Sequence, residues 1–135
     1  MAIQVLKGAV VTINSIDLSD HITNIEISTT LEEIETTSFA SAGGRHRIAG
    51  LEDSSISFTF LQDFAANEVD ATMWSIRGSS VPVVIKTNAT VSAANPQYSA
   101  NVLITEWMPI ANAIGDAPEI SVEWPVNGTV TKATA

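Results

Sequence analysis

Alternation of apolar and polar residues is the main pattern along this chain, and it predicts short β-strands. It is cleanest at residues 55–61, where Ile56, Phe58 and Phe60 share one face and small hydroxyl residues occupy the other. Similar patterns fall in five further segments, at residues 11–18, 22–30, 81–86, 98–107 and 119–124. Within the first of these, Asn14 and Ser15 separate two apolar stretches, which indicates a hairpin closed by a tight turn.

One segment has the spacing of a helix instead. Its apolar residues recur every three or four positions, at Ala66, Val69, Met73 and Ile76. This period predicts a helix over residues 65–77, with Asp63 placed to cap its start and Gly78 to end it. One helix among about seven strands predicts a mostly β fold, a β-sandwich or barrel with one flanking α-helix. The length suits one domain, which we expect to span residues 1–135.

Residues 31–53 carry little regular pattern and predict a long inter-strand loop. A loop of this length inside a compact domain is uncommon and is usually functional or mobile. Three glycines, at positions 43, 44 and 50, make its middle flexible. We therefore treat this segment as a candidate functional segment.

Composition restricts the partners that the protein can have. Fifteen acidic residues against six basic ones give a net charge of −9, so nucleic acid and anionic membranes should repel the protein. Only 16% of the chain is charged and 45% is hydrophobic, which excludes the composition of disordered proteins. The absence of cysteine excludes disulfides, thiolate zinc sites and cysteine nucleophiles.

No stretch of the sequence predicts a targeting signal or a membrane span. Lys7 interrupts the apolar start of the chain, where a signal core would have to lie. The longest aliphatic runs have about four residues, whereas a membrane helix needs ~20. We expect the mature protein to be the whole chain, made in the cytoplasm.

Motifs for catalysis or metal binding are absent from the sequence. His21 and His46 lie in no nucleophile frame such as G-x-S-x-G, and we interpret both as ordinary surface residues. A zinc site would need several scattered carboxylates, and no calcium-loop motif occurs. We therefore predict no catalytic residue, no metal site and no cofactor.

Charged residues of both signs gather in the long loop. An acidic cluster, typical of a solvated face, consists of Glu32, Glu33 and Glu35. A basic cluster that lacks the motif of a phosphate-binding loop consists of Arg45, His46 and Arg47. Because the chain is acidic overall, a carboxylate-rich surface on another copy suits these arginines better than DNA does.

The predicted strands divide their faces by chemistry. On three of them one face is aliphatic or aromatic, and the other is Ser, Thr or Glu without any Lys or Arg. An ordinary solvent face is the simplest interpretation, but lysine is the usual solvent-facing residue on exposed strands. Small hydroxyls and acids without cations suit a surface along which a polyanion slides without binding.

Ordered fragments along nearly the whole chain carry a family resemblance. They are Glu33-Ile34-Glu35-Thr36-Thr37-Ser38-Phe39, Gly43-Gly44, Gly50-Leu51-Glu52-Asp53, Ser57-Phe58-Thr59-Phe60-Leu61-Gln62-Asp63, Asn95-Pro96-Gln97-Tyr98, Gly115-Asp116 and Ile120-Ser121-Val122-Glu123-Trp124-Pro125-Val126-Asn127-Gly128. In this order they resemble the tail tube (major tail) proteins of long-tailed bacteriophages. The resemblance implies a β-sandwich or barrel with one flanking helix, which assembles into rings, usually hexameric. These rings stack into a hollow tube for DNA ejection. The chain is short for this family, and we expect it to be without the extra immunoglobulin-like C-terminal module that many members carry.

The resemblance also implies partners, a location and contact residues. The partners would be further copies of the chain and the tape-measure, tail-terminator and tail-tip proteins, with phage DNA only in transit. The location would be the virion, after assembly in the host cytoplasm. In the long loop, we expect the residues that reach a neighbouring subunit or the next ring to be Glu32, Glu33, Glu35, Arg45, His46 and Arg47. Because successive strand residues point to opposite faces, we expect the residues that alternate with core positions to face the lumen. They are Glu26, Ser28, Ser57, Thr59, Glu119, Ser121 and Glu123.

Two alternatives remain open. One is a tail-terminator or baseplate protein of similar fold, which would form a single ring and would not polymerise. The other is a monomeric β-sandwich binding module, for instance a carbohydrate-binding or adhesion domain, which would need an exposed aromatic platform. Trp74, Trp107 and Trp124 all fall in predicted elements, where burial is at least as well favoured as exposure.

Overall fold

The computed structural model describes residues 4–111 and 113–134, and in this part of the chain strands predominate. The strands are β1 Val10–Ile13, β2 Ile16–Asp17, β3 Ile22–Glu35, β4 Arg47–Leu61, β5 Ser80–Lys86, β6 Gln97–Leu103, β7 Glu119–Pro125 and β8 Thr131–Ala133. The helical elements are α1 Val69–Ser75 and two single 3₁₀ turns, η1 Ser19–His21 and η2 Phe39–Ser41. No helix in the described part of the chain is long and apolar enough to cross a membrane.

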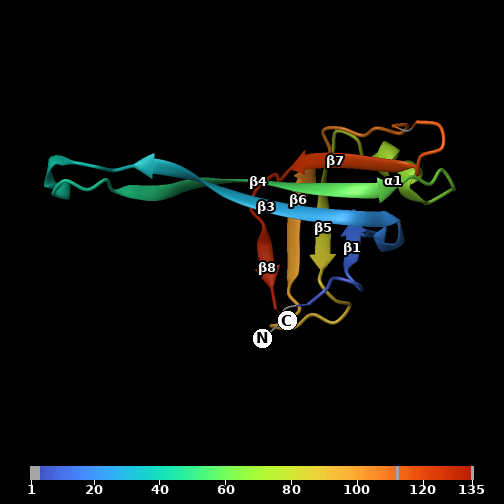
Figure 1. Cartoon of the computed structure of the whole chain (residues 1–135), viewed down its shortest axis with the longest axis horizontal. Coiled ribbons are helices and arrows are strands. Elements are labelled where there is room, and N and C mark those ends of the chain that lie inside the picture. Colours follow the sequence, from blue (N-terminus) through green and yellow to red (C-terminus); the bar gives the residue numbers. More distant parts are fainter. Residues whose placement is uncertain (1–3, 112, 135) are drawn as a thin grey trace.

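The strands form two antiparallel sheets that pack face to face. One has five strands in the order β2-β1-β5-β6-β8, and the other has three in the order β3-β4-β7. In Figure 1 the three-stranded sheet runs across the strands of the five-stranded one, with α1 at one end. This arrangement confirms the predicted mostly β fold with one flanking helix.

The core lies between the sheets and is aromatic at its centre. The side chains of Phe58, Phe60 and Trp124 are at most 1% exposed, and they come from neighbouring strands of the three-stranded sheet. Phe60 also meets the ring of Trp107 edge-on, at a centroid distance of 5.6 Å. The period-two pattern of the sequence thus corresponds to alternate residues of β4 and β7 whose side chains lie in the core.

The first hairpin forms as the sequence predicts. Asn14 and Ser15 connect β1 to β2 with φ angles of 52° and 67°. Positive φ at both central residues is the requirement of the tight turn whose twist matches two antiparallel strands, and asparagine tolerates it well.

Residues 31–53, predicted as an irregular loop, are instead mostly the outer part of a long β-hairpin. β3 continues to Glu35 and β4 begins at Arg47, so only residues 36–46 lie outside the strands. Figure 1 shows this hairpin, which we call the arm (residues 31–53), projecting far beyond the body of the molecule. Residues 31–40 and 42–49 are all exposed, so no buried face imposes apolar alternation, and the sequence pattern that marks a strand is missing.

The helix is shorter than the sequence predicts. α1 covers Val69–Ser75 rather than residues 65–77, because Asn67 has a left-handed φ of 62° that a helix cannot include. Asp63 does not cap the helix itself: its carboxylate accepts a hydrogen bond from the Ala65 amide, at 2.9 Å, in the preceding turn. The helix ends at Ser75 with Ile76 as its C-cap, so Gly78, with φ of 79°, lies in the following turn and does not end the helix as predicted.

The end of one strand and the presence of another also differ from the prediction. β6 ends at Leu103: the amide of Ile104 still donates to the carbonyl of Ser79, but the amide of Ser79 donates to the carbonyl of Ile76 and does not return the bond. β8 was not predicted, since its three residues carry no apolar alternation. It pairs with the start of β6, with Tyr98 opposite Lys132.

Candidate functional site: an acidic sheet face and a projecting arm

The three-stranded sheet brings the predicted lumen residues together on its outer face. In one row Glu26 of β3 lies opposite Ser57 of β4, which in turn lies opposite Glu123 of β7. The next row joins Thr59 to Ser121. We call this surface the acidic face; its residues are Asn24, Glu26, Ser28, Ser55, Ser57, Thr59, Glu119, Ser121 and Glu123.

Hydrogen bonds within the acidic face hold its side chains in cross-strand pairs. The Ser57 hydroxyl donates to a carboxylate oxygen of Glu123 at 3.4 Å. The hydroxyls of Thr59 and Ser121 lie 3.2 Å apart. The glutamates of this face remain exposed, so their charges are presented to whatever lies in front of the sheet.

None of the six Lys and Arg residues is among the residues of the acidic face. Their positions are Lys7 before β1, Arg45 and Arg47 in the arm, Arg77 after α1, Lys86 at the end of β5 and Lys132 in β8. The face therefore presents hydroxyl and carboxylate groups with no positive charge among them. Such a surface attracts no phosphate backbone, because phosphate binding depends on Lys and Arg.

Sequence reasoning missed Glu106, which extends the acidic face. Its carboxylate accepts from the amide of Glu123 at 3.3 Å, at the edge of β7 that pairs with no other strand. Its carbonyl accepts from the indole Nε1–H of Trp124 at 2.9 Å. The predicted strand at residues 98–107 concealed this role, since Glu106 in fact lies beyond β6 in the connection to β7.

The structure also places the charged residues of the arm. Arg47 pairs with Glu33 at 2.5 Å across the two strands, and Arg45 lies 3.4 Å from Glu35 near the tip. The amide of His46 donates to the hydroxyl of Thr37. In the single chain, both arginines thus contact carboxylates of their own hairpin, and contacts to another copy would replace these exposed pairs.

Apolar side chains of the arm are exposed, a feature that sequence reasoning did not single out. Phe39 at the tip is fully exposed, and the other members of this set are Leu31, Ile34, Ile48 and Leu51. Exposed apolar groups gathered on one element mark interaction surfaces. The signal in the sequence was present as five large apolar residues in a segment without a predicted core.

His21 is not the ordinary surface histidine that the sequence suggested. Its side chain is only 16% exposed, and its ring contacts the carboxylates of Asp20, Asp63 and Glu68. Partial burial disfavours the charged ring, but the hydrogen bonds to Asp20 and Asp63 outweigh it and raise the pKa of His21. A hydrogen bond from the Ala65 amide, assisted by His21, lowers the pKa of Asp63.

The tryptophans form no aromatic platform. Trp107 and Trp124 belong to the core, and Trp74 is half-exposed with the guanidinium of Arg77 over its ring, 3.5 Å from the centroid. A sugar-binding surface would need an open ring face, so this arrangement gives no support to a carbohydrate-binding module.

Comparison with known proteins gives the fold. No family model matches the sequence, and no curated protein matches it. A chain of the virion of a native gene transfer agent particle is similar over 97% of this chain and 99% of its own, with a TM-score of 0.76 and 15% identity. A chain from the tail of an empty gene transfer agent particle, an assembly with C6 symmetry, is similar over 84% of this chain and 82% of its own, with a TM-score of 0.65 and 16% identity. The fold of this protein is therefore that of phage-like virion and tail chains, as the resemblance to tail tube proteins implied.

Proposed function

We propose that this protein is the structural subunit of a phage-like tail tube, in which stacked hexameric rings form a hollow conduit for DNA ejection. The observation that carries the proposal is the fold shared over nearly the whole chain with a gene transfer agent virion chain. The C6 symmetry of the related tail supports six copies per ring. The proposal assigns no catalytic residue and no cofactor.

In this proposal the acidic face lines the channel. Six copies of a −9 chain carry a formal charge of −54 per ring, and part of it would face the lumen. DNA carries one negative charge per about 1.7 Å of its axis, so a cationic wall would hold it. The acidic face, which holds no cation, would instead repel the backbone and let DNA pass.

The arm, in turn, joins subunits. Its exposed apolar side chains gain from burial against a neighbouring subunit or the next ring. Arg45 and Arg47 are positioned to exchange their partners Glu35 and Glu33 for carboxylates of the neighbour. The exchange leaves the number of ion pairs unchanged, so the apolar contacts would supply the net gain.

We infer further partners from the same role. A tail tube subunit would meet tape-measure, tail-terminator and tail-tip proteins in the virion, after assembly in the host cytoplasm. DNA would pass through without specific binding. Because the arm is exposed in the single chain, it gains burial only against a neighbouring copy or a partner, and the chain can remain monomeric until one is present, since association itself carries an entropy cost.

Negative-stain electron microscopy of the purified chain tests the proposal. Samples would be taken over rising concentration, alone and with tail-tip proteins added. Hollow tubes with sixfold end views are the expected result. Isolated rings that never stack would indicate the single-ring alternative, and monomers under every condition would contradict a tube subunit.

A further inference from the structure

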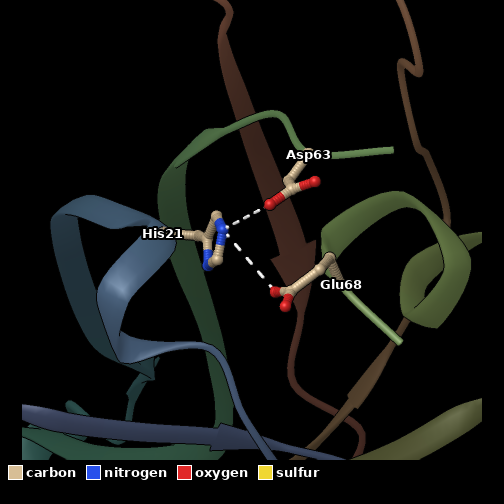
Figure 2. A group of neighbouring side chains, drawn as sticks. All are labelled: His21, Asp63 and Glu68. Atoms are coloured by element: carbon tan, nitrogen blue, oxygen red, sulfur yellow. Dashed lines mark hydrogen bonds and ion pairs between the residues drawn. The ribbon is translucent and has the colours of Figure 1, made fainter. Parts of the chain in front are cut away.

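His21, Asp63 and Glu68 come together at the end of the body opposite the arm (Figures 1 and 2). His21 ends η1, Asp63 follows β4, and Glu68 immediately precedes α1. The imidazole Nε2 lies 3.0 Å from Oδ2 of Asp63 and 3.6 Å from Oε2 of Glu68. All three of these potential ligand atoms lie within 4.8 Å of one another.

We propose that these three side chains bind a divalent transition-metal cation, with Zn²⁺ as the reference ion. Zinc is bound by histidine nitrogen and carboxylate oxygen at about 2.0–2.2 Å, in a tetrahedron. Two ligands of such a tetrahedron are about 3.3 Å apart, as these bond lengths require. The two distances from Nε2 lie on either side of this value, and the two carboxylate oxygens lie within 4.8 Å of each other, so small side-chain movements would bring all three atoms onto one ion.

The other ring nitrogen is held as a zinc-binding histidine needs it. Nδ1 of His21 lies 2.8 Å from Oδ1 of Asp20, which can accept its proton. This hydrogen bond favours the tautomer whose Nε2 carries a lone pair, and a carboxylate on the far side of the ring is a recurrent support of metal-bound histidine. Asp20 would therefore act as a positioning residue.

The orientation of Asp63 is likewise fixed from outside the site. Its Oδ1 accepts from the Ala65 amide at 2.9 Å, which leaves Oδ2 directed at His21. The side chains of Asp63 and Glu68 are 36% and 37% exposed, so an ion can enter from solvent. Water would complete the coordination on that side.

Charge balance also favours a cation here. Three carboxylates, of Asp20, Asp63 and Glu68, surround one imidazole. In the described part of the chain no Lys or Arg forms an ion pair with any of them. A proton on His21 supplies positive charge at this site, and a metal ion would supply it by replacing that proton, because metal binding requires the neutral ring.

A bound ion would link segments that are distant in the sequence. His21 and Asp63 are 42 positions apart. The ion would fasten η1, just before β3, to the connection between β4 and α1. We therefore expect the metal to stabilise this end of the body, whether or not the chain is assembled.

Isothermal titration of the purified chain with Zn²⁺, in metal-free buffer at pH 7.5, tests the site. We expect one ion per chain and a higher unfolding temperature with zinc. His21→Gln should weaken zinc binding by more than about tenfold, and Asp20→Asn should weaken it by about 10–100-fold. His46→Gln, which changes the other histidine of the chain in the distant arm, should bind as the wild type does.

Two results would overturn the site: no zinc binding by the wild-type chain, or equal losses in the two histidine variants. If the His21→Gln variant fails to fold, nitrogen NMR spectroscopy of the wild-type chain serves as the test in its place. Zinc should then shift the Nε2 resonance of His21 and leave its Nδ1 protonated. An unchanged ring would contradict the proposal. Because binding is measured per chain, these results are independent of whether tubes form.

Discussion

At the scale of single residues, the aromatic cluster around Phe60 lies fully inside the core and is expected to contribute strongly to stability. Its ring lies 5.6 Å from those of Phe58 and Trp107 and 6.1 Å from that of Trp124, between centroids. Aromatic pairs at such distances contribute beyond the area they bury. The cluster joins the three-stranded sheet to the segment that follows β6, so it fixes the position of the acidic face.

We expect Phe60→Ala to lower the free energy of unfolding by about 3–5 kcal/mol, the usual cost of removing a buried phenylalanine. Urea denaturation of the monomer measures this change. Phe39→Ala at the tip of the arm is the matched control, since its ring is fully exposed, and it should change stability by about 0.5 kcal/mol or less. Equal losses in both variants would contradict the assigned core.

Asp17 gives the protein an acid-sensitive contact. Its carboxylate accepts from the hydroxyl of Ser19 at 2.5 Å and from the amide of Ser19 at 2.9 Å. These bonds lower the pKa of Asp17 below its ordinary value of 3.8. The stabilisation is therefore complete above the pKa of the unfolded chain and is lost as the pH falls through the folded pKa.

For Asp17→Asn, we expect a smaller loss of stability on acidification below about pH 4 than in the wild type. Thermal unfolding at a series of pH values measures the slope of stability against pH. Ser19→Ala removes the hydroxyl donor and should reduce the slope in the same direction. Parallel pH curves for wild type and Asp17→Asn would show that this carboxylate does not contribute.

At the scale of elements, the arm can be removed without disturbing the body. Leu31 and Glu52 lie directly opposite each other in the β3–β4 pair. Replacing residues 32–51 by Asn-Gly should close the shortened hairpin with a two-residue turn. Because the core contains no arm residue, we expect the variant to unfold as the wild type does but to form no tubes in electron micrographs.

A second variant separates the tip from the strands of the arm. It replaces residues 36–46 by Asn-Gly between Glu35 and Arg47, which are also register partners. If this tip variant forms tubes and the fully shortened variant does not, the contacts between subunits belong to the paired strands rather than to the tip. Normal tubes from the fully shortened variant would show that the arm is not the joining element.

Strands and helices could be predicted from the sequence where one of their faces is buried. Strands with both faces exposed could not be predicted. Ser57 and Thr59 alternate with core residues, so both their strand and their face could be predicted. The strands of the arm have no sheet packed on them, so nothing in their sequence distinguishes them from a loop. The shortened α1 depends on the left-handed backbone of Asn67, which an apolar period does not encode.

The candidate sites divide in the same way. The acidic face follows from alternation in single strands, and register then brings its rows together. The cluster at His21 could not be predicted, because Asp63 lies 42 positions away and meets His21 only through the tertiary fold. The inter-subunit role of the arm and the lumen role of the acidic face stay predictions, since both concern other copies of the chain.

At the scale of the whole molecule, the proposed function would depend on an electrostatic field summed over many subunits. Replacing Glu26, Glu119 and Glu123 together by Lys changes the formal charge of each chain from −9 to −3, and each lysine would face passing DNA. We expect tubes that still assemble but eject DNA slowly, with the defect relieved at high salt, where screening shortens the range of the attraction.

The triple change of the same residues to Gln serves as the control for lost charge without reversed charge. Its ejection rate should lie between those of the wild type and the Lys variant. Ejection at the normal rate by assembled Lys tubes would contradict a lumen role for the acidic face, and would leave the tube itself unaffected.

The long hairpin also exposes the free chain to aggregation. β7 pairs with β4 only from Ser55 inward, so both strands of the arm are unpaired edges that carry exposed apolar side chains. Such edges invite indiscriminate strand pairing between molecules, which natural proteins oppose by placing charge along them. Glu32, Glu33 and Glu35 lie on the arm segment of β3, and although Glu33 and Glu35 pair with the two arginines of the hairpin, the arm keeps an excess of acidic residues, so two arms that approach edge to edge repel each other. The same acidic cluster would thus oppose pairing between free chains and favour a partner that supplies complementary charge.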